Sequence, residues 1–169
     1  MDFIKKHIWL AVLVVLLVLF VVNGINTVPT LDEKVKAAWS QVDNQYQRRM
    51  DLVPNLVETV KGYANFEKST LTDVINARAS ATKVTLSPEM LSDPEAVKKF
   101  EQAQGALTTT LSRLMVVSEQ YPDLKANQQF LSLQSQLEGT ENRIAIARKD
   151  YIATVQEFNT MVRTFPGRI

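Results

Sequence analysis

The sequence predicts an all-α protein: an N-terminal transmembrane helix followed by an elongated antiparallel bundle of three long helices with proline kinks. Three observations support this fold class. Residues 8–22 are an unbroken apolar run, apolar residues then recur at spacings of three and four, and the 169 residues include only 5 glycines and 6 prolines. No alternating strand pattern is found, so helices are the only class of element expected.

Residues 1–25 are predicted to form the membrane anchor. The run IWLAVLVVLLVLFVV follows Lys5 and Lys6, and Trp9 stands where an interfacial aromatic is expected. As a helix this run rises only about 22 Å, so flanking apolar residues and snorkelling lysines must complete a span of ~30 Å. The alternative is a cleaved signal peptide, but no pair of small residues follows the run as a processing site. We therefore expect an uncleaved anchor.

The lysines also predict an orientation. Lys5 and Lys6 lie directly against one end of the apolar run, whereas Lys34 and Lys36 lie further from the other end and beside acidic residues. The positive-inside rule therefore places the N-terminus in the cytoplasm and the bundle on the periplasmic, or extracytoplasmic, side.

Residues 26–30 are expected to be a linker, and residues 31–169 to be the bundle domain. A capping-box pattern predicts that a helix starts at Thr30. The apolar stripe then continues over residues 31–83, which predicts one long helix or two collinear ones. Pro54 is expected to kink or break this helix, because an interior proline removes a backbone donor and costs roughly 3 kcal/mol.

Two further helices complete the predicted bundle. Asp93 is a good N-cap with a proline after it, so the second helix is expected to start there and to run to about Gln120. Pro122 should interrupt the chain, because proline disfavours α geometry in the residue before it. Residues 126–162 carry the most regular stripe, a pattern typical of antiparallel bundles and coiled coils.

The composition excludes several classes of function. Cysteine is absent and His7 is the only histidine, which removes disulfides, thiolate sites and His-based triads or metal sites. The net charge of +1 has no basic block of the kind that nucleic-acid binding requires. No phosphate-binding or nucleophile motif is present. We therefore expect no enzymatic activity, no cofactor, no metal and no nucleic-acid partner.

The candidate contact residues lie around the central proline. Arg48, Arg49 and Asp51 could form a charged cluster for a partner or lipid headgroups, and Asn55 follows Pro54 directly. The alternative is a solvated helix face with local ion pairs, each contributing only tenths of a kcal/mol. The polar pair Asn142-Arg143 is expected to lie inside the bundle, and the threonines at 108–110 on its surface.

Several motifs occur in the same order as in the bacterial LemA family. They are AWSQVD at 38–43, RRMDLVPNLVETVKGY at 48–63, YPDLKAN at 121–127, and EGTENRIA at 138–145. The sequence resembles this family over nearly its whole length. The resemblance implies a single-pass protein of the bacterial inner membrane, with a bundle of long helices and no recognised enzymatic activity.

Two functions are compatible with these features. The first is a structural or scaffolding protein that forms homo-oligomers and organises membrane-protein partners at the lipid bilayer. The alternative is an accessory or adaptor subunit of a membrane protease or transporter, since members of the family often accompany membrane proteases. The apolar stripes are wider than a single helix contact requires, which favours self-association.

Overall fold

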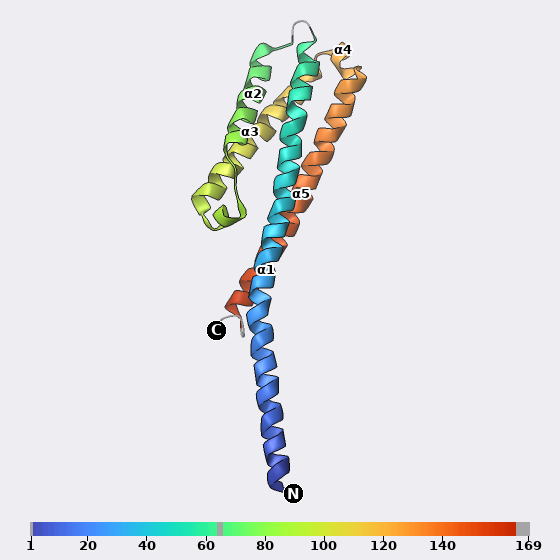
Figure 1. Ribbon diagram of the computed structural model, residues 1–169. Helices are drawn as coiled ribbons and strands as arrows, with labels where there is room; N and C mark the ends of the chain where they lie inside the picture. The colour runs from blue at the N-terminus through green and yellow to red at the C-terminus, as the bar shows by residue number, and fades with distance from the viewer. Residues whose placement is uncertain (1, 64–65, 165–169) are drawn as a thin grey trace. The chain divides into compact units, whose positions relative to one another are not determined.

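The structure is a computed structural model that describes residues 2–63 and 66–164, and every element in this part of the chain is helical. The predicted all-α class is confirmed. The helices, labelled in Figure 1, are α1 (Asp2–Lys61), α2 (Lys68–Lys83), α3 (Pro94–Ser118), α4 (Pro122–Lys125) and α5 (Gln128–Arg163), with a 3-10 helix, η1 (Pro88–Ser92), between α2 and α3.

The chain divides into two compact units, which are described separately. The first comprises residues 1–39 and 148–169, and the second comprises residues 40–147. Helices α1 and α5 contribute to both units.

In the first unit, the N-terminal part of α1 exposes apolar side chains at nearly every position from 8 to 22. This is the one helix in the described residues that is long and apolar enough to cross a membrane, with a mean hydropathy of 2.9 over its most apolar window. None of that window is buried in the protein. The helix is therefore compatible with the predicted membrane anchor.

The expected linker at 26–30 is helical, and Thr30 does not begin a helix, because α1 runs through this segment. Leu31 and Trp39 are buried, so packing fixes the part of α1 that follows Pro29. Continuing the existing helix costs one backbone hydrogen bond, because Pro29 has no N–H, whereas starting a new helix would cost a nucleation step. The helix therefore continues.

Helices α1 and α5 run antiparallel in the first unit. The ring centroids of Trp39 and Tyr151 lie 5.3 Å apart in an edge-to-face arrangement, and Lys34 Nζ lies 3.9 Å from Glu157 Oε1. Moving back along α1 therefore corresponds to moving forward along α5.

Burial raises the pKa of the Tyr151 hydroxyl, because desolvation disfavours the phenolate.

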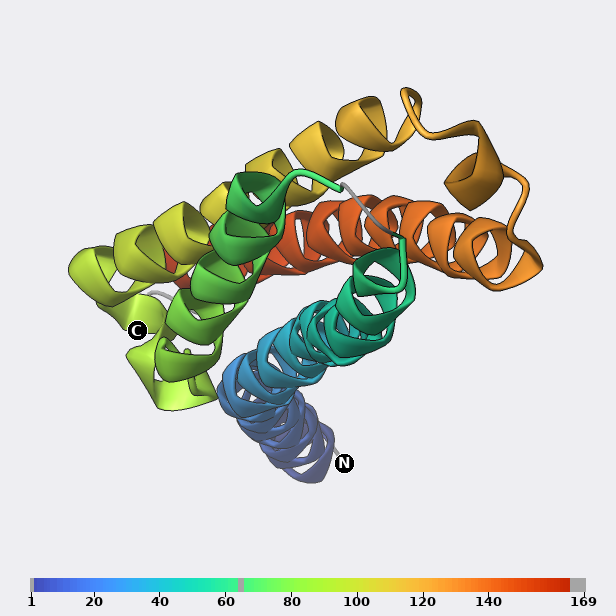
Figure 2. The same cartoon turned by 90° about the horizontal axis from the view of Figure 1, so that it is seen from above.

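In the second unit, the predicted first helix over 31–83 is replaced by two helices that fold back on each other. α1 continues through Pro54 and ends at Lys61, and α2 then returns beside α3 (Figures 1 and 2). The expected break at Pro54 and the collinear arrangement are therefore wrong. A collinear α2 would leave Leu71 and Val74, which are buried, without a packing partner.

A hydrogen bond explains why α1 tolerates Pro54. Proline has no N–H, so the carbonyl of Met50, four residues earlier, loses its helical donor. In the structure, Arg78 Nε of α2 donates to this carbonyl at 2.9 Å. A charged donor from the neighbouring helix thus takes the place of the missing amide.

The double substitution of Pro54 and Arg78 tests this exchange. Replacing Arg78 with leucine should lower the free energy of unfolding by about 1.5–3 kcal/mol, the usual range for a hydrogen bond to a charged group. In a Pro54→Ala background the cost should fall by at least half, because the backbone amide that this substitution introduces can bond the Met50 carbonyl. Urea titrations of the unmodified chain, the two single variants and the double variant, followed by circular dichroism, measure this coupling. An equal loss of stability on replacing Arg78 in both backgrounds would contradict it.

The start of α3 and the interruption before α5 agree with the sequence. The Asp93 carboxylate accepts from the Glu95 amide at 2.9 Å, so α3 begins at the predicted N-cap. The interruption at Pro122 is confirmed, since α3 ends at Ser118 and the short α4 begins at Pro122. Asn127 Oδ1 then accepts from the Phe130 amide at 2.9 Å at the start of α5.

The core of the second unit is formed by apolar residues from all four longer helices of the described chain. Leu56, Val60, Val74, Leu107 and Leu114 are fully buried within it. The predicted apolar stripes account for most of this core, and Leu86 in the connection before α3 is buried as well.

Candidate functional site

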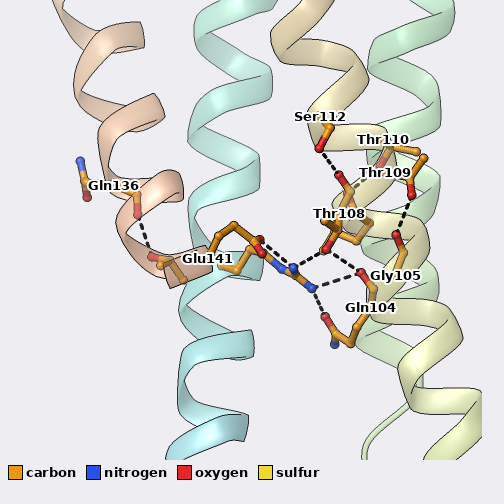
Figure 3. Close-up of polar contacts among 11 residues, drawn as sticks. Gln104, Gly105, Thr108, Thr109, Thr110, Ser112, Gln136 and Glu141 are labelled. Atoms are coloured by element: carbon orange, nitrogen blue, oxygen red, sulfur yellow. Dashed lines mark hydrogen bonds and ion pairs between the residues drawn. The ribbon is translucent and has the colours of Figure 1, made fainter. Parts of the chain in front are cut away.

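A buried arginine lies at the centre of the second unit. Arg49 comes from α1, and only 1% of it is exposed. Its Nη1 donates to Thr108 Oγ1 at 2.6 Å and to Glu141 Oε1 at 2.7 Å, while its Nη2 donates to Gln104 Oε1 at 2.5 Å and to the Gln104 carbonyl at 3.2 Å. Figure 3 shows these contacts, which join α1, α3 and α5.

The surroundings of Arg49 compensate for the loss of water around its charge. The Glu141 side chain is 39% exposed, so the ion pair has one buried end and one hydrated end. The guanidinium carbon lies 5.1 Å from the centroid of the Tyr46 ring, within the range of a cation–π contact. Arg49 Nε and Gln104 Nε2 are buried without a partner in the described part of the chain, so the network does not use its full donor capacity.

The structure separates the four predicted contact residues. Arg48, Asp51 and Asn55 are exposed, whereas Arg49 points into the protein. Consecutive residues of an α-helix are about 100° apart around its axis, so Arg48 and Arg49 face different surroundings. Asn55 does not cap a resumed helix, because α1 is continuous there, and its carbonyl accepts from Thr59 Oγ1 at 2.8 Å. A contact of the exposed residues with lipid or a partner remains a prediction.

Sequence reasoning missed the partners of Arg49. Thr108 was expected on the surface, yet it is half-buried and bonds to the arginine. Asn142 and Arg143 were expected inside the bundle, yet both are exposed. One usable signal was the spacing in α1: the positions 42, 46, 49, 53, 56 and 60 are all buried, at gaps of four and three, and Arg49 occupies one of them.

A groove between α3 and α5 adjoins this network. Its volume is about 290 Å³, and its lining residues are Thr108, Leu111, Ser112, Met115, Gln134, Leu137, Glu138 and Glu141. The buried Leu111 and Leu137 form an apolar floor, and Glu138 and Glu141 put two carboxylates on one wall. Gln134 Nε2 donates to Glu138 Oε1 at 3.1 Å.

Exposed apolar residues continue the groove beyond its lining. Val116 follows Ser112 by one turn of α3 and is 68% exposed, and Leu131 precedes Gln134 by one turn of α5 and is 42% exposed. The described residues contain no cluster of three or more acidic or histidine side chains that could hold a metal ion. The apolar floor and the carboxylates of the groove suit it to binding a side chain or a helix through apolar contact and charge.

A packed helical unit together with one apolar helix compatible with membrane anchoring defines a class: membrane-associated, all-helical proteins. The particular family follows from comparison with known sequences. The chain belongs to the LemA family, whose family model matches residues 38–169.

Named relatives are similar over most of this chain. It is 28% identical over 157 residues to magnetosome protein MamQ 2 of Paramagnetospirillum magneticum, covering 83% of this chain and 58% of the relative. It is 26% identical over 179 residues to magnetosome protein MamQ of Magnetospirillum gryphiswaldense, covering 95% of this chain and 66% of the relative. It is 25% identical over 132 residues to protein LemA of Metamycoplasma hominis, covering 78% of this chain and 56% of the relative. The chain thus spans little more than half the length of the first and the last of these.

Proposed function

We propose that this chain is a membrane-anchored scaffolding protein that self-associates and organises partner proteins at the bacterial inner membrane. Its helical unit would lie on the extracytoplasmic side, as the lysines before the apolar run favour, and would act without catalysis. The observation that carries the proposal is the open groove between α3 and α5, whose apolar floor continues into the exposed Val116 and Leu131. Large exposed apolar side chains that adjoin a groove favour a protein contact.

The self-association is argued from the physical chemistry of the groove. Among the residues whose exposure the structure describes, Val116 is the most exposed large apolar residue outside the N-terminal apolar run, with 68% of its surface accessible. Covering apolar surface contributes about 25 cal/mol per Å² removed from water. Membrane insertion also confines the copies to two dimensions, so a weak contact between helical units gains from the high local concentration.

The mass of the full chain in detergent tests the proposal. We expect a protein mass of two or more copies of the 19.1 kDa chain by light scattering. Val116→Glu should reduce the mass to one copy, because it places a charge on the apolar contact. Ile75→Glu is the matched control, since Ile75 is an exposed apolar residue of α2 outside the groove, and it should retain the oligomer. A single-copy mass for the unmodified chain would overturn self-association.

A second candidate function, an adaptor for another membrane protein, is favoured by the exposed groove carboxylate of Glu138. Since Glu141 is paired with Arg49, it is Glu138 that would complement a basic helix of a different protein, because opposite charges steer and orient association. A photo-crosslinking residue at position 138, used in native membranes, separates the two candidates. Adducts between copies of this chain support the scaffold, and adducts with another protein alone support the adaptor.

A further inference from the structure

The C-terminal end of α5 lies at a level set by its pairing with α1. Trp39 contacts Tyr151, and Lys34 contacts Glu157, so a step of five residues back along α1 matches a step of six forward along α5. Continuing this pairing for seven more residues brings Thr164 level with residues 27–28 of α1. Figure 1 shows the red end of α5 beside α1.

This level is close to the expected edge of the membrane. Thr27 follows Val22, the last residue of the apolar run, by five positions. At 1.5 Å per residue this places the end of α5 about 8 Å beyond the run. The headgroup layer on each side of a bilayer is about 5–8 Å thick, and an arginine side chain can extend toward it. The last turn of α5 is therefore within reach of lipid headgroups.

The charges near this level are of one sign. On α1, no charged residue occurs between Val22 and Asp32. On α5, Arg163 is the only charged residue after Glu157 in the part of the chain that the structure describes. Arg163 is exposed, and its side chain makes no hydrogen bond or ion pair with the described residues. A guanidinium is geometrically matched to two phosphate oxygens.

We propose that the last turn of α5 contacts the headgroup layer of the membrane that holds α1, and that Arg163 binds the phosphate groups of anionic lipids there. The half-buried Met161 and Val162 adjoin this turn and keep its inner face on the protein. The contact would fix the first unit to the bilayer at two points, α1 and the end of α5. It requires α1 to be inserted, and it does not depend on self-association.

The absence of cysteine makes a direct test possible. Thr164→Cys carries a fluorophore next to Arg163, and Asp150→Cys carries the same label further along α5 as the matched control, since both positions are exposed. The full chain is reconstituted in vesicles that contain anionic lipid and a headgroup-attached quencher. We expect quenching at Thr164 to be several-fold stronger than at Asp150. Equal quenching at the two positions would overturn the headgroup contact.

The role of Arg163 is tested in the same vesicles. Adding Arg163→Gln to the Thr164→Cys chain should reduce the quenching by at least half with anionic lipid, and Arg163→Lys should restore most of it. Unchanged quenching in the Arg163→Gln chain would overturn the phosphate contact. Release of the unmodified chain from membranes by alkaline carbonate would overturn insertion, and the inference with it. None of these outcomes depends on the mass measured for self-association.

Discussion

Replacing Arg49 with alanine is expected to lower the free energy of unfolding by about 3–5 kcal/mol, the range seen when one partner of a buried ion pair is removed. The substitution leaves Gln104 Oε1 and Thr108 Oγ1 without the donor that joins them to α1. It also leaves a cavity at a position that is only 1% exposed. Glu141 contributes less to the loss, because it is partly exposed and can be hydrated.

The neighbouring arginine is the matched control for this measurement. Arg48→Ala removes the same charge from the same helix at an exposed position, so the stability should change by about 0.5 kcal/mol or less. Arg49→Lys should recover only part of the loss, since one ammonium cannot reproduce the two nitrogens that reach Glu141 and Gln104. Urea titration of the full chain in detergent, followed by circular dichroism, compares the variants. Similar costs at the two arginines would contradict the buried network.

Phe130→Ala is expected to cost about 3–5 kcal/mol, through loss of apolar burial and formation of a cavity. Phe130 is 1% exposed and belongs to the core near the start of α5. The hydrogen bond from its backbone amide to Asn127 does not need the ring, so the cap of α5 should survive. The expected loss therefore reports on packing alone.

Leu131 is the matched control for Phe130. It follows in the same helix and is 42% exposed, so Leu131→Ala should cost less than about 1 kcal/mol. The same urea titrations compare the two variants. Equal losses would mean that α5 packs with a different face toward the core than the one described.

The helix start at Asp93 and the interruption at Pro122 could be predicted because their signals are local: each rests on residues within a few positions. The turn after Lys61 has a weaker local signal, a single glycine, Gly62, directly after the last residue of α1. Pro54 has the stronger local signal for a break, but its effect is offset by Arg78, which donates to a carbonyl 28 residues away. Periodicity predicts which residues are buried, but it does not show where a helix reverses its direction.

The candidate site shows the same limit. Arg49 has the spacing of a buried residue, but arginine is almost never fully buried unless it is paired. Its partners lie 55, 59 and 92 residues away, on two other helices. No local pattern connects these positions. The arginine was therefore predicted as a surface contact, although its side chain joins three helices inside the protein.

The bond between Arg78 and the Met50 carbonyl also specifies a register. Proline leaves one carbonyl of this part of α1 without its helical donor, at residue 50, and Arg78 of α2 supplies a donor to it. If α2 slid along α1 by one turn, the arginine would face carbonyls already bonded within the helix, and the Met50 carbonyl would lose its partner. Pro54 thus distinguishes the correct alignment of two helices whose apolar faces alone would permit several.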